Sequence, residues 1–322
     1  MPKILLTNYY GSKPLAFVQK LVPEGFELIP LEQPGQDEVI RRAADADYML
    51  VGGRTRIDAK VLDSAPKLKM IQRSGVGLDS LDLEAIRARG LPLYVNEGIN
   101  ARSVAEHTLM LILGTLRRIG EVNTVTHEGQ WLKHEMGIDC HDLFGKQIGL
   151  IGLGSIGTHV AEILKAFGVN TVYFKRNRLE SDRENQLNVR YVSLQELLEG
   201  SDIISLHTAL NDETFNLIGR DELASMKDGA VLINTARGGL IDEAAMLDSL
   251  KSGQLGGAGL DAFSEEPMLS NHPLMEMNNV LATPHIGSIT AETFAGMIGG
   301  ALENIALFEG GKSEQISARR VV

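Results

Sequence analysis

The sequence has little of several things, and each shortage argues against a class of protein. Its 322 residues include a single cysteine, Cys140, which excludes an internal disulfide and a multi-cysteine metal site. Aspartate and glutamate outnumber lysine and arginine by 42 to 31, and the net charge of -11 argues against general nucleic-acid binding. No run of about 18 apolar residues is present, and the apolar stretch near the N-terminus is too short for a signal peptide. We therefore expect a soluble cytoplasmic protein that does not span a membrane.

The chain instead contains short apolar runs that alternate with amphipathic segments. Runs typical of strands include Ile4–Thr7, Tyr48–Val51 and Leu93–Asn96, and helical segments such as Asp58–Ser64 lie between them. A second alternating series begins at Gln147. This alternation predicts βαβ units and parallel sheets. We expect an α/β protein with two Rossmann-like or flavodoxin-like domains.

Two helical segments interrupt this alternation and bear on the domain boundaries. Residues 103–128 read as one long helix, followed by an irregular stretch that contains Trp131 and His134. Residues 290–309 form a helical pattern after the last strand of the second series. This last helix can pack back on the first domain, which would make that domain discontinuous.

A glycine-rich turn follows the apolar run Gln147–Ile151. Gly152, Gly154 and Gly157 have the spacing of a dinucleotide-binding turn, and a helical pattern follows them. The first glycine permits a sharp turn, the second lets a pyrophosphate approach the backbone, and the third lets helix and strand pack closely. The turn therefore predicts a dinucleotide site.

A basic run stands where such sites usually place an acid that binds the adenosine ribose. Lys175, Arg176 and Asn177 follow the next strand at the expected distance from the glycines. An acid there repels a 2′-phosphate, whereas Arg176 can form paired, charge-assisted bonds to one and Lys175 adds a point charge. We expect NADP as the cofactor, with NAD as the alternative.

Three charged residues each follow an apolar strand in the second half of the chain. Arg237 follows "AVLINTA", Glu266 follows "GLDAF" and His285 follows "NVLATP". Ligands of open α/β sheets bind beyond the carboxyl ends of the strands, so these side chains should converge there. They match carbonyl reduction of an acid: arginine binds the carboxylate, histidine exchanges a proton with the oxygen, and glutamate orients the histidine and favours its charged form.

Several stretches together resemble the D-isomer-specific 2-hydroxyacid dehydrogenase family, over nearly the whole chain. They are "SVAEHTLMLIL" (103–113), "GLIGLGSIG" (149–157), "DIISLHTALNDETFNLI" (202–218), "MKDGAVLINTARGGLIDEAAMLDSL" (226–250), "GGAGLDAFSEEP" (256–267) and "TPHIGS" (283–288). The resemblance implies a discontinuous substrate domain, here 1–100 with 288–322, and a nucleotide domain at 101–287. It also implies a homodimer, in which Trp131 or His134 reaches toward the partner subunit.

The resemblance also assigns roles to individual residues. Arg237, Glu266 and His285 match the catalytic residues. The cofactor contacts are Gly152, Gly154, Ser155, Ile156, Gly157, Lys175, Arg176, Asn177, His207, Thr208, Thr235, Ala236 and Asp261, the last of these beside the nicotinamide amide. The substrate contacts are Arg54 and the loop residues Gly75, Val76 and Gly77. No metal site is expected, and His107 is expected to be structural.

The expected activity is NADPH-dependent reduction of a short 2-oxo acid, such as glyoxylate or hydroxypyruvate, to a D-2-hydroxy acid. An NAD-linked D-3-phosphoglycerate dehydrogenase is an alternative, although relatives that act on phosphoglycerate tend to have an extra basic residue before Arg54, where this chain has Gly52 and Gly53. A cofactor-sensing, corepressor-like binding protein is a third possibility, against which the complete catalytic set argues.

Overall fold

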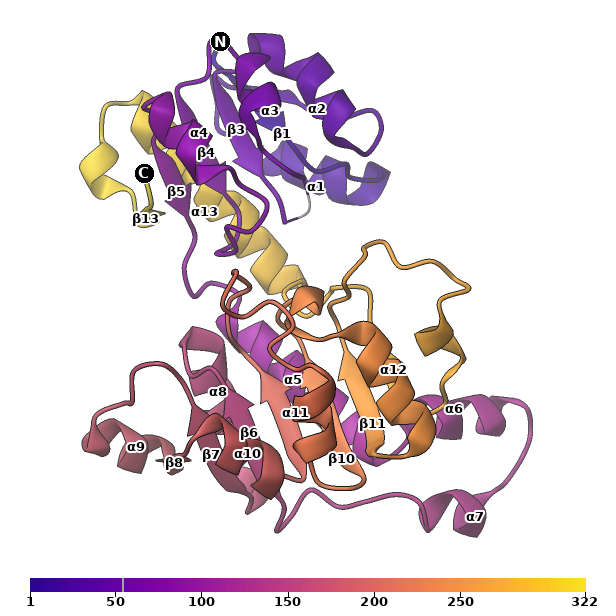
Figure 1. Ribbon diagram of the computed structural model, residues 1–322. Coiled ribbons are helices and arrows are strands. Elements are labelled where there is room, and N and C mark those ends of the chain that lie inside the picture. The colour runs from indigo at the N-terminus through magenta and orange to yellow at the C-terminus, as the bar shows by residue number, and fades with distance from the viewer. Residues whose placement is uncertain (54) are drawn as a thin grey trace. The chain divides into compact units, whose positions relative to one another are not determined.

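The computed structural model describes residues 1–53 and 55–322, and this part of the chain divides into two compact units. Met1–Asn100 and Ala291–Val322 form the first unit, and Ala101–Thr290 form the second. Each unit is a mostly parallel sheet covered by helices on both faces (Figure 1), which confirms the α/β fold expected from the sequence. No helix of the described residues is long and apolar enough to cross a membrane.

The sheet of the first unit has the strand order β13-β5-β4-β3-β1-β2, in which β13 alone among the described strands is antiparallel to its neighbour. Its strands are β1 (Lys3–Leu6), β2 (Glu27–Ile29), β3 (Tyr48–Val51), β4 (Met70–Arg73), β5 (Leu93–Val95) and β13 (Arg319–Arg320). Its helices are α1 (Ser12–Leu21), α2 (Gln36–Arg42), α3 (Ala59–Asp63), α4 (Leu83–Ala88) and α13 (Ala291–Glu309). The helices α1 and α13 cover one face, and α2, α3 and α4 cover the other.

The second unit has the strand order β12-β11-β10-β9-β6-β7-β8, with all described pairs parallel. Its strands are β6 (Gln147–Ile151), β7 (Asn170–Phe174), β8 (Val189–Tyr191), β9 (Ile203–Leu206), β10 (Ala230–Asn234), β11 (Leu255–Leu260) and β12 (Val280–Ala282). Its helices are α5 (Ala101–Leu116), α6 (Ile119–His127), α7 (Lys133–Gly137), α8 (Ser155–Leu164), α9 (Ser181–Leu187), α10 (Leu194–Gly200), α11 (Arg220–Ser225) and α12 (Glu243–Ser252).

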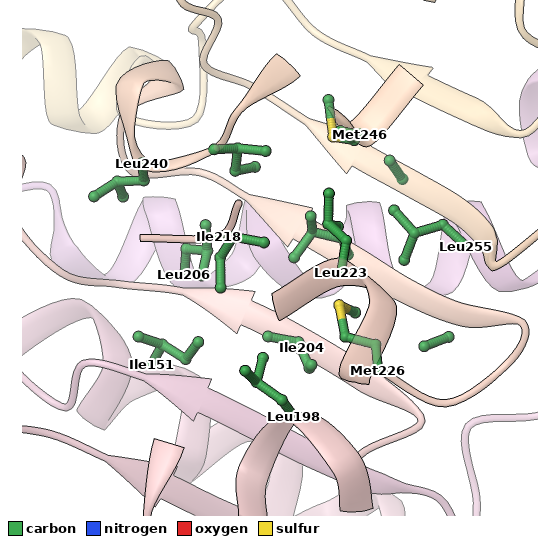
Figure 2. Packing of buried hydrophobic residues seen from close by; sticks show 14 of the residues in the cluster. Ile151, Leu198, Ile204, Leu206, Ile218, Leu223, Met226, Leu240, Met246 and Leu255 are labelled. Carbon is green, nitrogen blue, oxygen red and sulfur yellow. The ribbon is translucent and has the colours of Figure 1, made fainter. Parts of the chain in front are cut away.

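The central strands β6, β9 and β10 of the second unit are buried on both faces because their side chains alternate between two hydrophobic cores. In β6, Ile148 and Leu150 pack toward α5 and α8, whereas Ile151 packs toward α10, α11 and α12. Figure 2 shows the second of these cores, where Ile204 of β9 lies near Leu198 of α10 and Met226, which directly follows α11. This packing holds the carboxyl ends of neighbouring strands at one edge of the sheet.

Local side-chain caps mark the start of some of the helices. The carboxylate of Asp58 accepts hydrogen bonds from the amides of Lys60 and Val61 at the start of α3, and Asp242 accepts one from Ala245 at the start of α12. Such caps satisfy amides that have no partner within the helix.

The expectation of one continuous helix over 103–128 is wrong. Helix α5 ends at Leu116 and α6 begins at Ile119. Arg118, between them, has a φ of 50°, a left-handed conformation that a continuous helix does not contain. Its guanidinium lies 2.9 Å from Asp139 and 2.6 Å from Glu121, and these ion pairs favour the turn.

Candidate active site

The glycine turn of the second unit has the geometry that a dinucleotide pyrophosphate requires. Gly152 has a φ of 96°, and a Cβ added to it would lie 2.4 Å from the carbonyl oxygen of His207. A Cβ on Gly157 would lie 2.5 Å from the carbonyl oxygen of Gly152. Protein packing therefore requires glycine at both positions.

Gly154 differs, because a Cβ there would meet nothing within 4 Å. The space above it is open, beside the N-terminus of α8, where the amides of Ser155 and Ile156 begin the helix. A helix N-terminus with open space in front of it favours a bound anion. These residues fit the pyrophosphate of a dinucleotide.

The basic run follows β7, and its cations have different partners. Lys175 donates a hydrogen bond of 3.4 Å from Nζ to the carbonyl oxygen of Leu153 in the glycine turn. Arg176 pairs through Nη2 with Oε2 of Glu213, and these two side chains are 75% and 72% exposed. Asn177, the next residue, is exposed. Lys175 thus borders the glycine turn, and Arg176 is held by an exposed acid from another loop.

Arg178 is committed to the protein itself. Its Nε and Nη2 atoms donate to both oxygens of Glu184 at 2.8 and 2.7 Å, and the hydroxyl of Tyr173 donates to Glu184 at 2.6 Å. The Arg178 and Tyr173 hydrogen bonds lower the pKa of Glu184 to about 2. Burial and the Glu184 carboxylate raise the pKa of Tyr173 to about 12. The Arg178–Glu184–Tyr173 cluster therefore fixes the C-terminal end of the loop that carries the basic run.

His207 and Thr208 follow β9 beside the glycine turn. The ring atom Nε2 of His207 lies 2.9 Å from Oγ of Ser205, and the buried Nδ1 has no hydrogen-bond partner among the described residues. Burial lowers the pKa of His207 to about 4, so the ring is neutral near pH 7.

The three charged residues predicted to be catalytic all belong to the second unit and follow adjacent strands of its sheet. Arg237 follows β10, Glu266 follows β11 and His285 follows β12, in the strand order β12-β11-β10. The ring atom Nδ1 of His285 lies 2.9 Å from each oxygen of Glu266, and both side chains are partly buried. The amide of Phe263 also donates to Glu266 at 3.1 Å, which orients the carboxylate. Glu266 therefore fixes the orientation of the imidazole ring through Nδ1.

The loop that carries Arg237 is fixed at several points. Its carbonyl oxygen accepts a hydrogen bond of 2.8 Å from the side chain of Asn234, and its Nη1 donates to the carbonyl oxygen of Ala236 at 2.8 Å. A Cβ on Gly238 would lie 1.9 Å from the carbonyl carbon of Phe263, so only glycine fits there. Thr235 is buried, with its hydroxyl 2.9 Å from that of Thr108 on α5.

Asp261 follows β11 and is 2% exposed. Its carboxylate accepts hydrogen bonds of 2.8 Å from the amides of Ile286 and Gly287, which follow His285. The structure thus binds Asp261 to the histidine loop, and the expected contact of Asp261 with the nicotinamide amide stays a prediction.

In the first unit, the expected substrate loop follows β4. Val76 is exposed and Gly75 is partly exposed in this loop, as is Gly77. Arg54 lies outside the described residues. Sequence reasoning assigned no role to Arg73, whose guanidinium is buried and donates to the carbonyl oxygen of Gly52 and, at 3.2 Å, to Oγ of Ser80. These bonds join the loops after β3 and β4. In the sequence, Arg73 ends an apolar strand and precedes a glycine-rich loop, and this position could have indicated its role.

The arm between α5 and β6 is exposed. Trp131 is 85% exposed, Ile138 80% and Phe144 80%, and no side chain of α6 or α7 is buried against the described part of the chain. Figure 1 shows this segment, which also contains His134, as an extended arm at the margin of the second unit. Across the described ranges, no cluster of three or more His, Cys, Asp or Glu residues is placed to hold a metal ion.

A doubly wound sheet with a glycine turn after β6 defines the second unit as a dinucleotide-binding domain. Residues 109–287 match the family model of the D-isomer specific 2-hydroxyacid dehydrogenase NAD binding domain. The chain is 37% identical to a glyoxylate reductase of Aeropyrum pernix, over 94% of each chain. It is 39% identical to a D-3-phosphoglycerate dehydrogenase of Mycobacterium tuberculosis, over 91% of this chain and 54% of that protein.

A crystal structure of a protein from Thermus thermophilus, 36% identical, matches with a TM-score of 0.88 over 99% of this chain and 100% of the other. The chain belongs to the D-isomer-specific 2-hydroxyacid dehydrogenase family. It is therefore a nicotinamide-dependent enzyme that interconverts 2-oxo acids and 2-hydroxy acids.

Proposed function

We propose that this enzyme reduces short 2-oxo acids, such as glyoxylate or hydroxypyruvate, to D-2-hydroxy acids, and that it prefers NADPH to NADH. The observation that carries the reaction is the His285–Glu266 pair, at 2.9 Å, next to the strand end that bears Arg237. The similarity to glyoxylate reductases supports the substrate class. Lys175, which bonds the glycine turn, and the exposed Arg176 that follows it support the 2′-phosphate.

The protein's part in the reaction is to bind the acid and supply a proton. The bound cofactor supplies the hydride that adds to the 2-oxo carbon. Because Glu266 occupies Nδ1 of His285, the ring transfers its proton from Nε2 to the carbonyl oxygen, so that no free alkoxide forms. Arg237 is always charged, binds the substrate carboxylate as a paired fork and polarises the carbonyl. In the reverse direction His285 accepts the proton.

The remaining predicted contacts have supporting roles. The amides of Val76 and Gly77 form a small anion nest that helps to hold the substrate carboxylate. Thr235 and Ala236 line the nicotinamide side, and Asp261 borders its amide. Arg54 contacts the substrate. Gly152, Gly154, Ser155, Ile156 and Gly157 hold the pyrophosphate, and His207 and Thr208 lie on the adenine side.

Steady-state kinetics test this proposal directly. Glyoxylate, hydroxypyruvate, pyruvate and 3-phosphohydroxypyruvate would each be assayed with NADPH and with NADH. We expect the highest kcat/KM for an unphosphorylated short 2-oxo acid with NADPH. A preference for the phosphorylated substrate with NADH would favour the D-3-phosphoglycerate dehydrogenase alternative, which the Mycobacterium tuberculosis relative supports. Tight cofactor binding without turnover of any substrate would favour the corepressor-like alternative.

We also propose that the enzyme is a homodimer in which the arm of one subunit packs on the other. The support is the exposure of Trp131, Ile138 and Phe144, since apolar side chains grouped on one exposed segment are typical of an interface. Sedimentation should give twice the 35.0 kDa chain mass. Ile138→Glu should shift the protein toward monomer, whereas a wild-type monomer with full activity would rule the arm exchange out.

A further inference from the structure

His107 is a largely buried polar side chain that the proposed reaction does not use. It lies on α5, and its side chain is 14% exposed. Its Nε2 lies 2.9 Å from Oγ1 of Thr283, two residues before His285. On the other side of His285, a Cβ added to Gly287 would lie 3.1 Å from Cδ2 of His107. His107 therefore borders the histidine loop both before and after the proposed proton donor.

The carboxylate of Asp261 binds the same loop. It accepts a hydrogen bond of 2.6 Å from the hydroxyl of Thr283 and bonds of 2.8 Å from the amides of Ile286 and Gly287. These donors lie on both sides of His285 in the chain. Burial alone would raise the pKa of Asp261, but the hydrogen bonds from His107, Thr283 and the two amides outweigh it and hold the pKa below its usual value. The carboxylate is therefore ionised and accepts the bonds from Thr283, Ile286 and Gly287.

Hydrogen-bond accounting defines the role of His107 in this group. The hydroxyl of Thr283 has one proton, and the 2.6 Å contact assigns it to Asp261. The 2.9 Å contact between Thr283 and His107 then requires a donor on Nε2 of His107. The same nitrogen lies 3.4 Å from Oδ1 of Asp261, which also favours a proton there. His107 thus donates to the threonine, and the threonine donates to the carboxylate.

The loop needs such support because of its backbone conformation. His285 has a φ of 54°, in the left-handed region that a residue with a Cβ rarely adopts. A conformation of this kind persists when surrounding contacts hold it, and it is found often at functional sites. The contacts available here are the 3.0 Å bond from the His285 amide to Thr283 and the bonds to Asp261.

We propose that His107 is a positioning residue for His285. Its Nε2–H donates to the hydroxyl of Thr283 and so orients that hydroxyl toward Asp261. The carboxylate of Asp261 then accepts hydrogen bonds from this hydroxyl and from the amides of Ile286 and Gly287. This clamp holds His285 in the left-handed conformation in which it contacts Glu266. This inference rests on the proposed function for its catalytic consequence, while the clamp itself can be tested without turnover.

The test compares variants of His107 in the full-length enzyme. His107→Phe keeps a flat ring and removes the donor. His107→Gln keeps a donor, because its amide nitrogen can take the place of Nε2. Thr108→Val is the matched control on the same helix, since Thr108 bonds Thr235 and does not bond the clamp. Amide hydrogen exchange at Ile286 and Gly287 reports the clamp, and kcat and KM for glyoxylate reduction report its consequence.

We expect His107→Phe to accelerate exchange of the two amides by at least about tenfold. It should also lower kcat on the order of 10- to 100-fold, with little change in KM, because misplacement of a proton donor affects the chemical step. His107→Gln should restore both values, and Thr108→Val should leave exchange at Ile286 and Gly287 unchanged.

Unchanged exchange or unchanged kcat in His107→Phe would overturn the proposal. The proposal would also be overturned if His107→Gln showed the same fast exchange and low kcat as His107→Phe, because the packing of the side chain and not its hydrogen-bond donor would then matter. If the wild type reduced none of the 2-oxo acids, the proposed function would fail, and the exchange rates would still decide whether the clamp exists.

Discussion

Replacement of Arg176 by alanine tests the cofactor preference most directly. Arg176 follows β7 at the position where an acid would exclude a 2′-phosphate. In the structure its partner is Glu213, and both side chains are about three-quarters exposed. Exposed ion pairs of this kind contribute about 0–1 kcal/mol. A 2′-phosphate can therefore displace Glu213 from Arg176 at small cost.

The size of the effect follows from the charge-assisted bonds that Arg176 would form with the phosphate. Such bonds contribute about 1.5–3 kcal/mol, and each 1.4 kcal/mol is about a tenfold change in affinity. Arg176→Ala should thus weaken NADPH binding roughly 10- to 150-fold and leave NADH binding nearly unchanged. Glu213→Gln removes the competing carboxylate and should tighten NADPH binding by up to about fivefold.

Dissociation constants for both cofactors, measured by fluorescence titration at one fixed ionic strength, give the answer. Constant ionic strength matters because exposed charges are screened by salt. Arg183→Ala is the matched control: it removes the same charge from α9, where Arg183 bonds Gln186 at 3.1 Å. Equal losses of NADPH and NADH affinity in Arg176→Ala would refute the 2′-phosphate assignment, as would an effect no larger than that of Arg183→Ala.

Further predictions concern the acid–base pair and the buried ionisable groups. Glu266→Gln removes the charge 2.9 Å from His285 but keeps a hydrogen bond, so kcat for reduction should fall by at least about tenfold with little change in the NADPH dissociation constant. An unchanged kcat would show that the charge of Glu266 does not support the proton transfer. His285→Asn, whose side chain tolerates the left-handed backbone, should lower kcat on the order of 10²–10⁴-fold with little change in the NADPH dissociation constant, and near-normal turnover would rule out His285 as the proton donor. His207 should destabilise the fold in acid: the unfolded chain binds a proton near pH 6.5, whereas the folded state does so only near pH 4. The free energy of unfolding should therefore fall by up to about 3 kcal/mol as pH drops between these values. His207→Gln keeps a donor toward Ser205, and its free energy of unfolding, measured by denaturant titration at each pH, should not show this fall. If the free energies of variant and wild type fell in parallel with pH, His207 would not be the cause.

Much of the fold and site follows from local sequence. Short apolar runs predict strands and amphipathic segments predict helices, because side chains repeat with different periods along the two structures. Their alternation along the chain was enough to predict the α/β fold. The glycine spacing is also a local pattern, although the atom that excludes a Cβ at Gly152 belongs to His207, which follows the neighbouring strand β9. Arg237, Glu266 and His285 could be grouped because carboxyl ends of parallel strands share one edge of a sheet.

Other features were decided by tertiary structure alone. Nothing in the helical pattern of 103–128 indicated that Arg118 would pair with Asp139 and leave the helix at that point. The basic run did not reveal that Arg178 belongs to Glu184 while Arg176 faces Glu213, 37 residues away. His107 and Thr283 are 176 residues apart. Contacts of this kind depend on which loops the packed sheet brings together. They also depend on which distant donors are available to each buried acceptor. The sequence around either residue therefore does not predict them.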